Sequence, residues 1–343
     1  MNYLIFRTDR IGDYLIISPL IKAIKRNNSN NKVYIVCSKK NIDFVIKDKL
    51  VEKTFVLDSN RLTDKFKLFF ELKKNRFDKI IVSDKKNRSI LITLFLKSNN
   101  KVFNISKYFQ KKILNLFYKN VFLDNDNNKN ESIKDILINN SNALGINLKD
   151  EDFHYLQLNQ FLKEFTNEDF LKLKIDNFVL FHYDEKWELD NYKKLYKKAS
   201  TFTKIDTDLE TFKEFLFELS EKTSKKVIIT TGTINTKLLS KLKETSLEIN
   251  KSFYEITIKG KKIYLLTDES FFSISHLISK SSLFISCHGA FTHIASNYKV
   301  KILDIIEKNK TLHYGRITKH MKNYKYLFRD NFSILSKEII TNL

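Results

Sequence analysis

The segment RTDRIGDYLIISPLIKAIKR, residues 7–26, holds the only proline of the chain, and it places Gly12 directly before Asp13. A short apolar run, YLIF at residues 3–6, comes just before it. An apolar run without polar alternation is typical of a strand covered on both faces. The residues after the turn have helical spacing, so the sequence predicts a strand, a tight turn and a helix, the unit from which α/β sheets are built.

The start of this helix has two interpretations. Ser18 and Pro19 have the form of an N-cap followed by proline at the first helical position. A helix that begins at Asp13 would instead contain Pro19 as a kink. In both cases Asp13 lies on the ligand side of the sheet, where Gly12 would let a ligand approach the backbone closely. The carboxylate of Asp13 then serves either as a general base for a substrate hydroxyl or as a structural charge at the helix start.

The same alternation of strands and helices occurs twice along the chain. It predicts an α/β protein with two Rossmann-like, doubly wound parallel-sheet domains that face a central cleft, where open α/β sheets bind ligands. We expect an N-terminal domain at residues 1–170, a second domain at 171–330 and a C-terminal helix at 331–343. The predicted strands are 3–6, 33–37, 54–57, 79–83 and 101–103 in the first half, and 178–182, 226–230, 263–266, 283–286 and 301–305 in the second.

The chain of 343 residues is strongly basic, with 61 Lys and Arg against 40 Asp and Glu and a net charge of +21. The lysines are spread along the whole sequence, which favours compositional drift over a dedicated basic patch. Attraction to an anionic membrane surface or an anionic substrate is the next interpretation. Binding to nucleic acid is the least favoured explanation of the charge, because the sequence has no basic tail and no nucleic-acid-binding motif. We therefore expect no nucleic acid as a partner.

The two cysteines, Cys37 and Cys287, lie far apart and fit a reducing compartment better than a disulfide scaffold. No apolar run approaches the ~18–20 residues that a membrane span needs. Charged residues from Arg7 to Asp13 interrupt the N-terminal apolar stretch, so a secretory signal is not expected. We therefore expect a cytoplasmic protein, with peripheral contact at the inner membrane face as an additional expectation.

The first motif, FRTDRIGDYLIISPLIKAIK, resembles the N-terminal motif of the heptosyltransferases, glycosyltransferase family nine, which have the GT-B fold. The resemblance covers residues 3–25. It implies that Asp13 is the catalytic base. It also implies that Arg10 and Gly12 face the acceptor, with the Arg10 cation meeting anionic groups. The dinucleotide fingerprint G-x-G-x-x-G and the Walker motif are both missing.

A second motif, HLISKSSLFISCHGAFTHIASNYKVKILDII, spans residues 276–306 and resembles the donor-binding segment of the same family. Backbone amides at a helix start beside a glycine form a natural phosphate site, and we expect this helix to open near Thr292. The sequence departs from the family at its acidic position, which falls on Cys287 or His288, and in the longer spacing from glycine to histidine. The residues expected to contact the donor here are His288, Gly289, Ala290, Thr292 and His293.

Two further elements belong to the expected donor site. Lys186 stands beside Trp187 in the polar loop after residues 178–182, where the family has a lysine that meets the donor phosphates; the alternative is a surface lysine beside a packed tryptophan. Thr231 and Gly232 follow the next strand and fit either a phosphate contact or a plain turn. Cys287, His288 and His293 match no common zinc pattern, so no metal is expected.

The resemblance implies a divergent member of the family. Such a protein would move a sugar from a nucleotide-sugar donor to a glycan or glycolipid acceptor of the lipopolysaccharide type, with inversion, without a metal and without a cofactor. The first alternative is a catalytically inactive GT-B protein that binds a nucleotide or glycan. The second is another GT-B enzyme, such as an epimerase-like or phosphorylase-like one.

Overall fold

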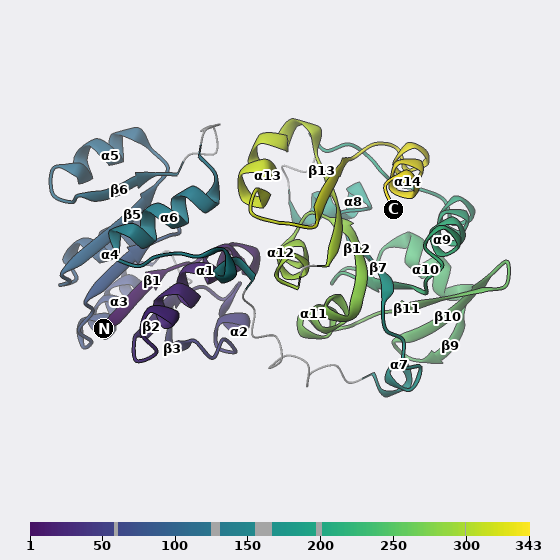
Figure 1. Cartoon of the computed structure of the whole chain (residues 1–343), viewed down its shortest axis with the longest axis horizontal. Coiled ribbons are helices and arrows are strands. Elements are labelled where there is room, and N and C mark those ends of the chain that lie inside the picture. The colour runs from purple at the N-terminus through teal and green to yellow at the C-terminus, as the bar shows by residue number, and fades with distance from the viewer. Residues whose placement is uncertain (58–60, 125–130, 155–166, 197–200, 299) are drawn as a thin grey trace. The chain divides into compact units, whose positions relative to one another are not determined.

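The computed structural model describes residues 1–343 except 58–60, 125–130, 155–166, 197–200 and 299 (Figure 1). The contacts divide the chain into two compact units. Unit 1 comprises residues 1–157 with 312–320, and unit 2 comprises 158–311 with 321–343. In the described ranges, no helix combines the length and the apolar character needed to cross a bilayer.

Unit 1 is built on a sheet that the described residues form from six strands in the order β3-β2-β1-β4-β5-β6, with every neighbouring pair parallel. This order belongs to the Rossmann fold, and it reverses between β1 and β4, so ligands are expected at the carboxyl ends of those two strands. The elements are β1 (Asn2–Phe6), α1 (Ile11–Asn27), β2 (Lys32–Cys37), α2 (Ile42–Val45), β3 (Val51–Val56), α3 (Leu62–Lys73), β4 (Lys79–Val82), α4 (Asn87–Phe95), β5 (Asn100–Ile105), α5 (Tyr108–Asn115), β6 (Asn120–Leu123), α6 (Ile133–Ala143), the 3-10 helix η1 (Asp150–His154) and, from later in the chain, α13 (Thr311–Thr318).

Unit 2 repeats the same order in its parallel part. Its described strands run β14-β13-β12-β7-β8-β11-β10-β9, in which β9 and β10 extend one edge as an antiparallel meander. The order reverses between β7 and β12, which places the ligand edge after these two strands. The elements are α7 (Glu168–Lys172), β7 (Phe178–Tyr183), α8 (Leu189–Leu195), α9 (Leu209–Thr223), β8 (Val227–Thr231), α10 (Lys237–Glu244), β9 (Leu247–Asn250), β10 (Phe253–Ile258), β11 (Lys261–Leu266), α11 (Phe271–Lys280), β12 (Ser281–Cys287), α12 (Ala290–Asn297), β13 (Lys301–Ile306), η5 (Lys308–Lys310), β14 (Tyr324–Phe328) and α14 (Phe332–Thr341).

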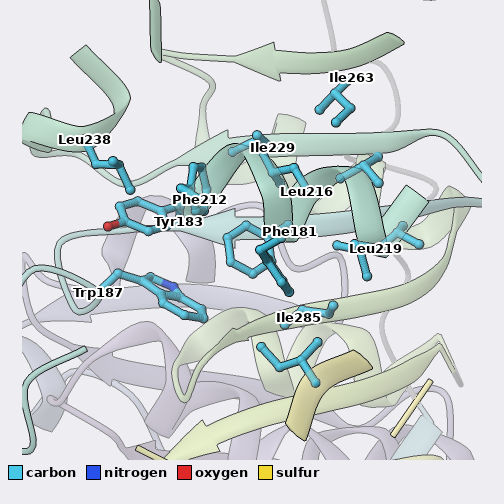
Figure 2. Close-up of a cluster of buried hydrophobic side chains, with 14 of the residues drawn as sticks. Phe181, Tyr183, Trp187, Phe212, Leu216, Leu219, Ile229, Leu238, Ile263 and Ile285 are labelled. Atoms are coloured by element: carbon cyan, nitrogen blue, oxygen red, sulfur yellow. The ribbon is translucent and has the colours of Figure 1, made fainter. Parts of the chain in front are cut away.

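The core of unit 2 is rich in aromatic side chains (Figure 2). Trp187 is fully buried and stacks on Tyr183, with ring centroids 5.5 Å apart, and its indole N–H donates to the carbonyl oxygen of His182 at 2.9 Å. The tryptophan therefore packs as a core residue. It also anchors the loop after β7, in which its neighbour Lys186 lies.

Helix α1 begins at Ile11, so the interpretation of Ser18 as its N-cap is wrong and Pro19 lies inside the helix. Proline lacks the N–H that would reach the carbonyl oxygen of Leu15, and the Ser18 hydroxyl donates to that oxygen instead, at 2.8 Å. Gly12 is the second residue of the helix, so it does not belong to the tight turn predicted between the strand and the helix.

The units differ from the predicted domains at residues 1–170, 171–330 and 331–343. Residues 312–320 belong to unit 1, because the buried Arg316 pairs with Asp124 at 3.1 Å and donates to the carbonyl oxygen of Glu131 at 2.8 Å. The C-terminal helix α14 is not separate from unit 2, since its Phe332 packs against Phe212 and Phe215 of α9.

Candidate functional site

The carboxylate of Asp13 lies in the first turn of α1 at the ligand edge of unit 1. Its Oδ1 pairs with the Nη2 of Arg7 at 3.0 Å, and its Oδ2 accepts the backbone N–H of Arg10 at 3.2 Å. The buried Arg7 also donates from Nε to the carbonyl oxygen of Asp13 at 2.9 Å. Because the Asp13 side chain is 40% exposed, it is held in place and still open on one side.

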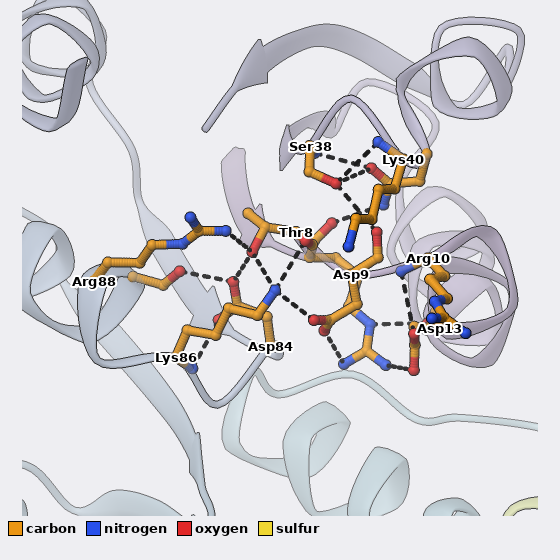
Figure 3. A network of polar contacts seen from close by, with 12 residues as sticks. Thr8, Asp9, Arg10, Asp13, Ser38, Lys40, Asp84, Lys86 and Arg88 are labelled. Atoms are coloured by element: carbon orange, nitrogen blue, oxygen red, sulfur yellow. Dashed lines mark hydrogen bonds and ion pairs between the residues drawn. The ribbon is translucent and has the colours of Figure 1, made fainter. Parts of the chain in front are cut away.

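A polar network joins the ends of β1, β2 and β4 beside Asp13 (Figure 3). The Thr8 hydroxyl donates to Oδ2 of the buried Asp84 at 2.6 Å, and the Lys86 ammonium donates to the Thr8 carbonyl oxygen at 2.9 Å. Burial raises the pKa of Asp84, although the hydrogen bonds from Thr8 and Ser89 oppose this shift. The network fixes the backbone at the reversal point of the sheet.

Asp13 lines a pocket of about 70 Å³ whose described lining lies entirely in unit 1. Its polar lining includes Arg7, Lys85, Asn104 and Asn140. Asn104 and Asn140 are buried, and the Oδ1 of Asn104 and both amide atoms of Asn140 make no hydrogen bond with any residue that the structure describes. Buried polar groups normally have partners, so these atoms give the pocket the ability to bind hydroxyl groups.

Lys186 is the centre of the ligand edge of unit 2. Its ammonium pairs with Asp184 at 2.7 Å and donates to the carbonyl oxygens of Cys287 and His288, each at 3.1 Å. Burial acts to lower the pKa of Lys186, but the Asp184 carboxylate outweighs it and the pKa is raised. Lys186 is therefore not a surface lysine; it is a fixed positive charge that links the loops after β7 and β12.

Two glycines make room for the loop that carries Lys186. A Cβ at Gly289 would lie 2.7 Å from the Lys186 Nζ, and a Cβ at Gly232 would lie 2.5 Å from a carboxylate oxygen of Glu185. Thr231 ends β8 immediately before Gly232 and is buried. The structure thus brings Thr231 and Gly232 beside the loop after β7, as a close-packed turn.

Helix α12 begins at Ala290, with Gly289 as its N-cap, two residues earlier than the expected start near Thr292. The Thr292 hydroxyl accepts the Gly289 N–H at 3.2 Å and donates to Asp304 at 3.1 Å. Amides at a helix start carry positive charge, and the Lys186 ammonium lies beside them. The combination suits a bound anion such as a phosphate.

The buried Asp304 on β13 organises this edge. Its Oδ2 lies 2.5 Å from the His288 Nδ1 and accepts the Tyr324 hydroxyl at 2.8 Å. His293 is buried, with its ring centroid 5.6 Å from that of His288. Thr292 and His293 therefore support the loop from inside, whereas Gly289 and Ala290 lie at its surface.

Arg329, after β14, ties the same loops together. It pairs with Glu307 at 2.9 Å and donates to the Lys186 carbonyl oxygen at 2.9 Å. Its Nη1 lies 3.4 Å from the sulfur of Cys287, whose pKa burial raises to about 12. Cys287 is buried and packs as a member of the hydrophobic core of unit 2.

Several residues at the ligand edges of the unit 1 and unit 2 sheets were not predicted from the sequence. Asp84 directly follows the predicted strand at residues 79–83, and this position was the signal that could have identified it. Asp184 lies two residues after the predicted strand at 178–182, and Asp304 lies inside the predicted strand at 301–305. No group of three or more His, Cys, Asp or Glu side chains is placed to hold a metal among the residues described.

Comparisons with known proteins give structural matches only. No family model matches the sequence, and no curated protein matches it. Among solved structures, the E. coli heptosyltransferase WaaC with ADP has a TM-score of 0.64 at 12% identity, covering 100% of each chain. The glycosyl transferase family 9 protein from Veillonella parvula has a TM-score of 0.62 at 12% identity, covering 99% of this chain and 90% of its own. The UDP-GlcNAc 2-epimerase from Methanocaldococcus jannaschii has a TM-score of 0.52 at 16% identity, covering 100% of this chain and 93% of its own.

At these identities the matches establish the fold. The chain has the GT-B fold, as predicted, and it resembles the heptosyltransferases along its whole length at low sequence identity.

Proposed function

We propose that this protein is a glycosyltransferase that moves a sugar from a nucleotide-sugar donor to a glycan or glycolipid acceptor of the lipopolysaccharide type. The observation that carries the proposal is the placement of Asp13. It lies at the reversal point of the unit 1 sheet, fixed by Arg7, and it lines a pocket with buried polar groups. The structural likeness to heptosyltransferases supports the same class of reaction by analogy of fold.

In this proposal Asp13 is the general base for an acceptor hydroxyl. Each carboxylate oxygen has two lone pairs, and the contacts with Arg7 and the Arg10 N–H use one on each oxygen. The remaining lone pairs can receive a proton as the hydroxyl attacks the anomeric carbon of the donor. Attack on the face opposite the leaving diphosphate would invert the configuration at that carbon.

In this proposal, unit 2 binds the nucleotide-sugar donor and stabilises its leaving group. As the bond between the sugar and the diphosphate breaks, negative charge develops on the leaving phosphate. The Lys186 ammonium and the start of α12 at Gly289 and Ala290 would stabilise that charge. These groups supply positive charge from the chain itself, so we propose that transfer needs neither a metal nor a cofactor.

The acceptor proposal rests on the chemistry of the pocket at Asp13. Lys85 and Arg7 are paired with Asp124 and Asp13, two carboxylates of the same pocket, and the amides of Asn104 and Asn140 offer donors and acceptors for hydroxyl groups. A carbohydrate acceptor matches these hydroxyl-binding groups. An acceptor of this kind on a lipid would place the enzyme at the inner face of the membrane.

The test is a transfer assay preceded by a donor screen. ADP-, UDP-, GDP- and CMP-sugars are compared by thermal shift, because a ligand that binds only the folded state raises its stability. ADP-linked sugars come first, since the similar WaaC structure holds ADP. Transfer by the wild type, with EDTA present, is then compared with transfer by Asp13→Asn.

Each outcome is informative. Nucleotide binding with transfer that depends on Asp13 supports the enzyme. Nucleotide binding with no transfer or hydrolysis by either protein favours an inactive binding protein. An epimerised nucleotide-sugar as product favours an epimerase, and loss of transfer with EDTA contradicts metal independence.

A further inference from the structure

Three helices of unit 1 carry large apolar side chains on their exposed faces. On α3, Leu62, Phe66 and Phe70 follow each other at every fourth position, while Leu68 and Leu72 point into the core. The helix therefore has two apolar stripes, of which only one is used for folding. Phe66 is 61% exposed.

Helices α4 and α5 continue this pattern. Leu91 and Phe95 on α4 are exposed, Phe95 by 69%, and Phe109 on α5 is 72% exposed. The three helices follow β3, β4 and β5, and right-handed crossovers put them on one face of the sheet. The amide of Gln110 donates to the side-chain oxygen of Asn87 at 2.7 Å, which joins α5 to α4.

Between α3 and α4 the exposed side chains form an apolar groove of about 330 Å³. Contiguous apolar side chains on an exposed face, rimmed by polar residues, are a feature of binding surfaces. The groove is lined by Leu62, Lys65, Phe66, Phe69, Arg88, Leu91, Ile92 and Phe95.

The two charged side chains that line this groove, Lys65 and Arg88, are both basic, although α3 also carries the exposed Asp64 and Glu71. From Lys85 to Leu123 the chain contains nine Lys and Arg and not one Asp or Glu, although the whole chain has 40 acidic residues. Exposed members include Lys97, Lys107 and Lys112. Exposed aromatic and aliphatic side chains with surrounding lysines are the features of a surface that lies in the headgroup region of an anionic bilayer.

We propose that the exposed face of α3, α4 and α5 docks onto an anionic lipid bilayer. The apolar side chains enter the boundary of the acyl chains, and the lysines contact the lipid headgroups. A neutral bilayer would receive the apolar side chains but would not attract the lysines. A soluble polyanion would attract the lysines but has no acyl chains for the apolar side chains to enter. This proposal goes beyond the proposed function and does not depend on catalysis.

Flotation of the full chain with vesicles tests the proposal. We expect binding to vesicles of phosphatidylcholine mixed with phosphatidylglycerol, weak binding to phosphatidylcholine alone, and loss of binding as salt is raised. Leu91→Ser combined with Phe95→Ser should weaken partitioning by at least about tenfold, because two apolar side chains no longer insert. The matched control, Leu247→Ser with Ile249→Ser, changes two exposed apolar residues of β9 in unit 2 and should leave binding unchanged.

Three results would overturn the proposal: no binding to the anionic vesicles, equal binding by both double variants, or a dimer that dissociates in Leu91→Ser/Phe95→Ser while vesicles stay unbound. The last would identify a second copy of the chain as the occupant, and sedimentation velocity detects it. Asp13→Asn should bind vesicles like the wild type, so a failure of the proposed catalysis is distinguishable from a failure of docking.

Discussion

Gly289 and Lys186 form a close contact in which the absence of a side chain is required. A Cβ on residue 289 would lie 2.7 Å from the Lys186 Nζ, closer than atoms of this kind approach each other. The ammonium also donates to the backbone on either side of this point, at the carbonyl oxygens of Cys287 and His288. Gly289 therefore lets a partly buried cation reach the start of a helix.

Gly289→Ala should weaken donor binding while the protein still folds. The new methyl group displaces the flexible end of Lys186 from the helix start, and loss of one such charge–phosphate contact costs about 1.5–3 kcal/mol, or roughly ten- to a hundredfold in affinity. Isothermal titration with the nucleotide identified in the donor screen measures the change. Gly315→Ala is the control, because its Cβ would meet no atom within 4 Å. Equal affinities of the two variants would contradict the role given to Gly289.

Lys186→Met should lower stability as well as donor affinity, because it leaves the buried Asp184 carboxylate without its partner. Breaking a buried pair in this way costs about 3–5 kcal/mol. Adding Asp184→Asn to Lys186→Met should recover most of that stability without recovering nucleotide binding. Urea unfolding and titration calorimetry separate the two effects; a double variant that binds nucleotide normally would remove Lys186 from the donor site.

The sequence predicted the parallel core of each sheet well, because doubly covered strands read as apolar runs. It missed β6, β9, β10 and β14. The residues of β10 alternate between buried and less buried positions. The strands β9 and β14 lie at the edges of the sheet and have exposed residues. None of these three strands therefore gives an unbroken apolar run in the sequence.

The candidate site was predictable where glycine or lysine follows a recognised strand, as at Lys186 and Gly289. Its supporting residues were not, because their roles depend on strand order. Asp304 and Arg329 meet the loop after β12 only because β13 and β14 pair beside it. Likewise Ser83 and Asp84 meet Arg7 and Thr8 only through the pairing of β1 with β4, which joins residues far apart in the chain.

Unit 2 should lose stability as the pH falls from 7 to 5, because burial lowers the pKa of His182 to about 4. The unfolded chain, with a pKa near 6.5, binds the proton first, so the stabilisation is complete above pH 6.5 and is lost as the pH falls toward 4. By pH 5 the loss is about 2 kcal/mol.

His182→Gln should reduce this dependence of stability on pH. The glutamine amide can still exchange a hydrogen bond with the Thr230 hydroxyl, which lies 3.0 Å from Nδ1 of His182. Trp187 is the only tryptophan and packs in unit 2, so its fluorescence during urea unfolding reports on that unit. His320→Gln is the comparison, since burial also lowers the pKa of His320 to about 4, but in unit 1. An unchanged slope in the fluorescence of His182→Gln would refute the assignment.

Asn140→Leu should make the protein more stable and a worse catalyst. Both amide atoms of Asn140 are buried in the pocket at Asp13 and make no hydrogen bond to the described residues, which costs stability in the free protein. Leucine has nearly the same size without that cost, so we expect the free energy of unfolding to rise by about 1–2 kcal/mol.

The catalytic effect of Asn140→Leu should appear in the kinetic constants for the acceptor. If the Asn140 amide binds an acceptor hydroxyl, Asn140→Leu raises the acceptor KM, with kcat/KM lower by roughly tenfold or more, and leaves the donor KM unchanged. Asn104→Leu, which removes the other unsatisfied oxygen of the pocket, should act in the same direction. Asn139→Leu is the control, because Asn139 lies next in the chain but bonds to Glu131 at 3.1 Å. A gain in stability without any change in acceptor kinetics would mean that the acceptor binds elsewhere, and Asp13 would then lose its place as the base.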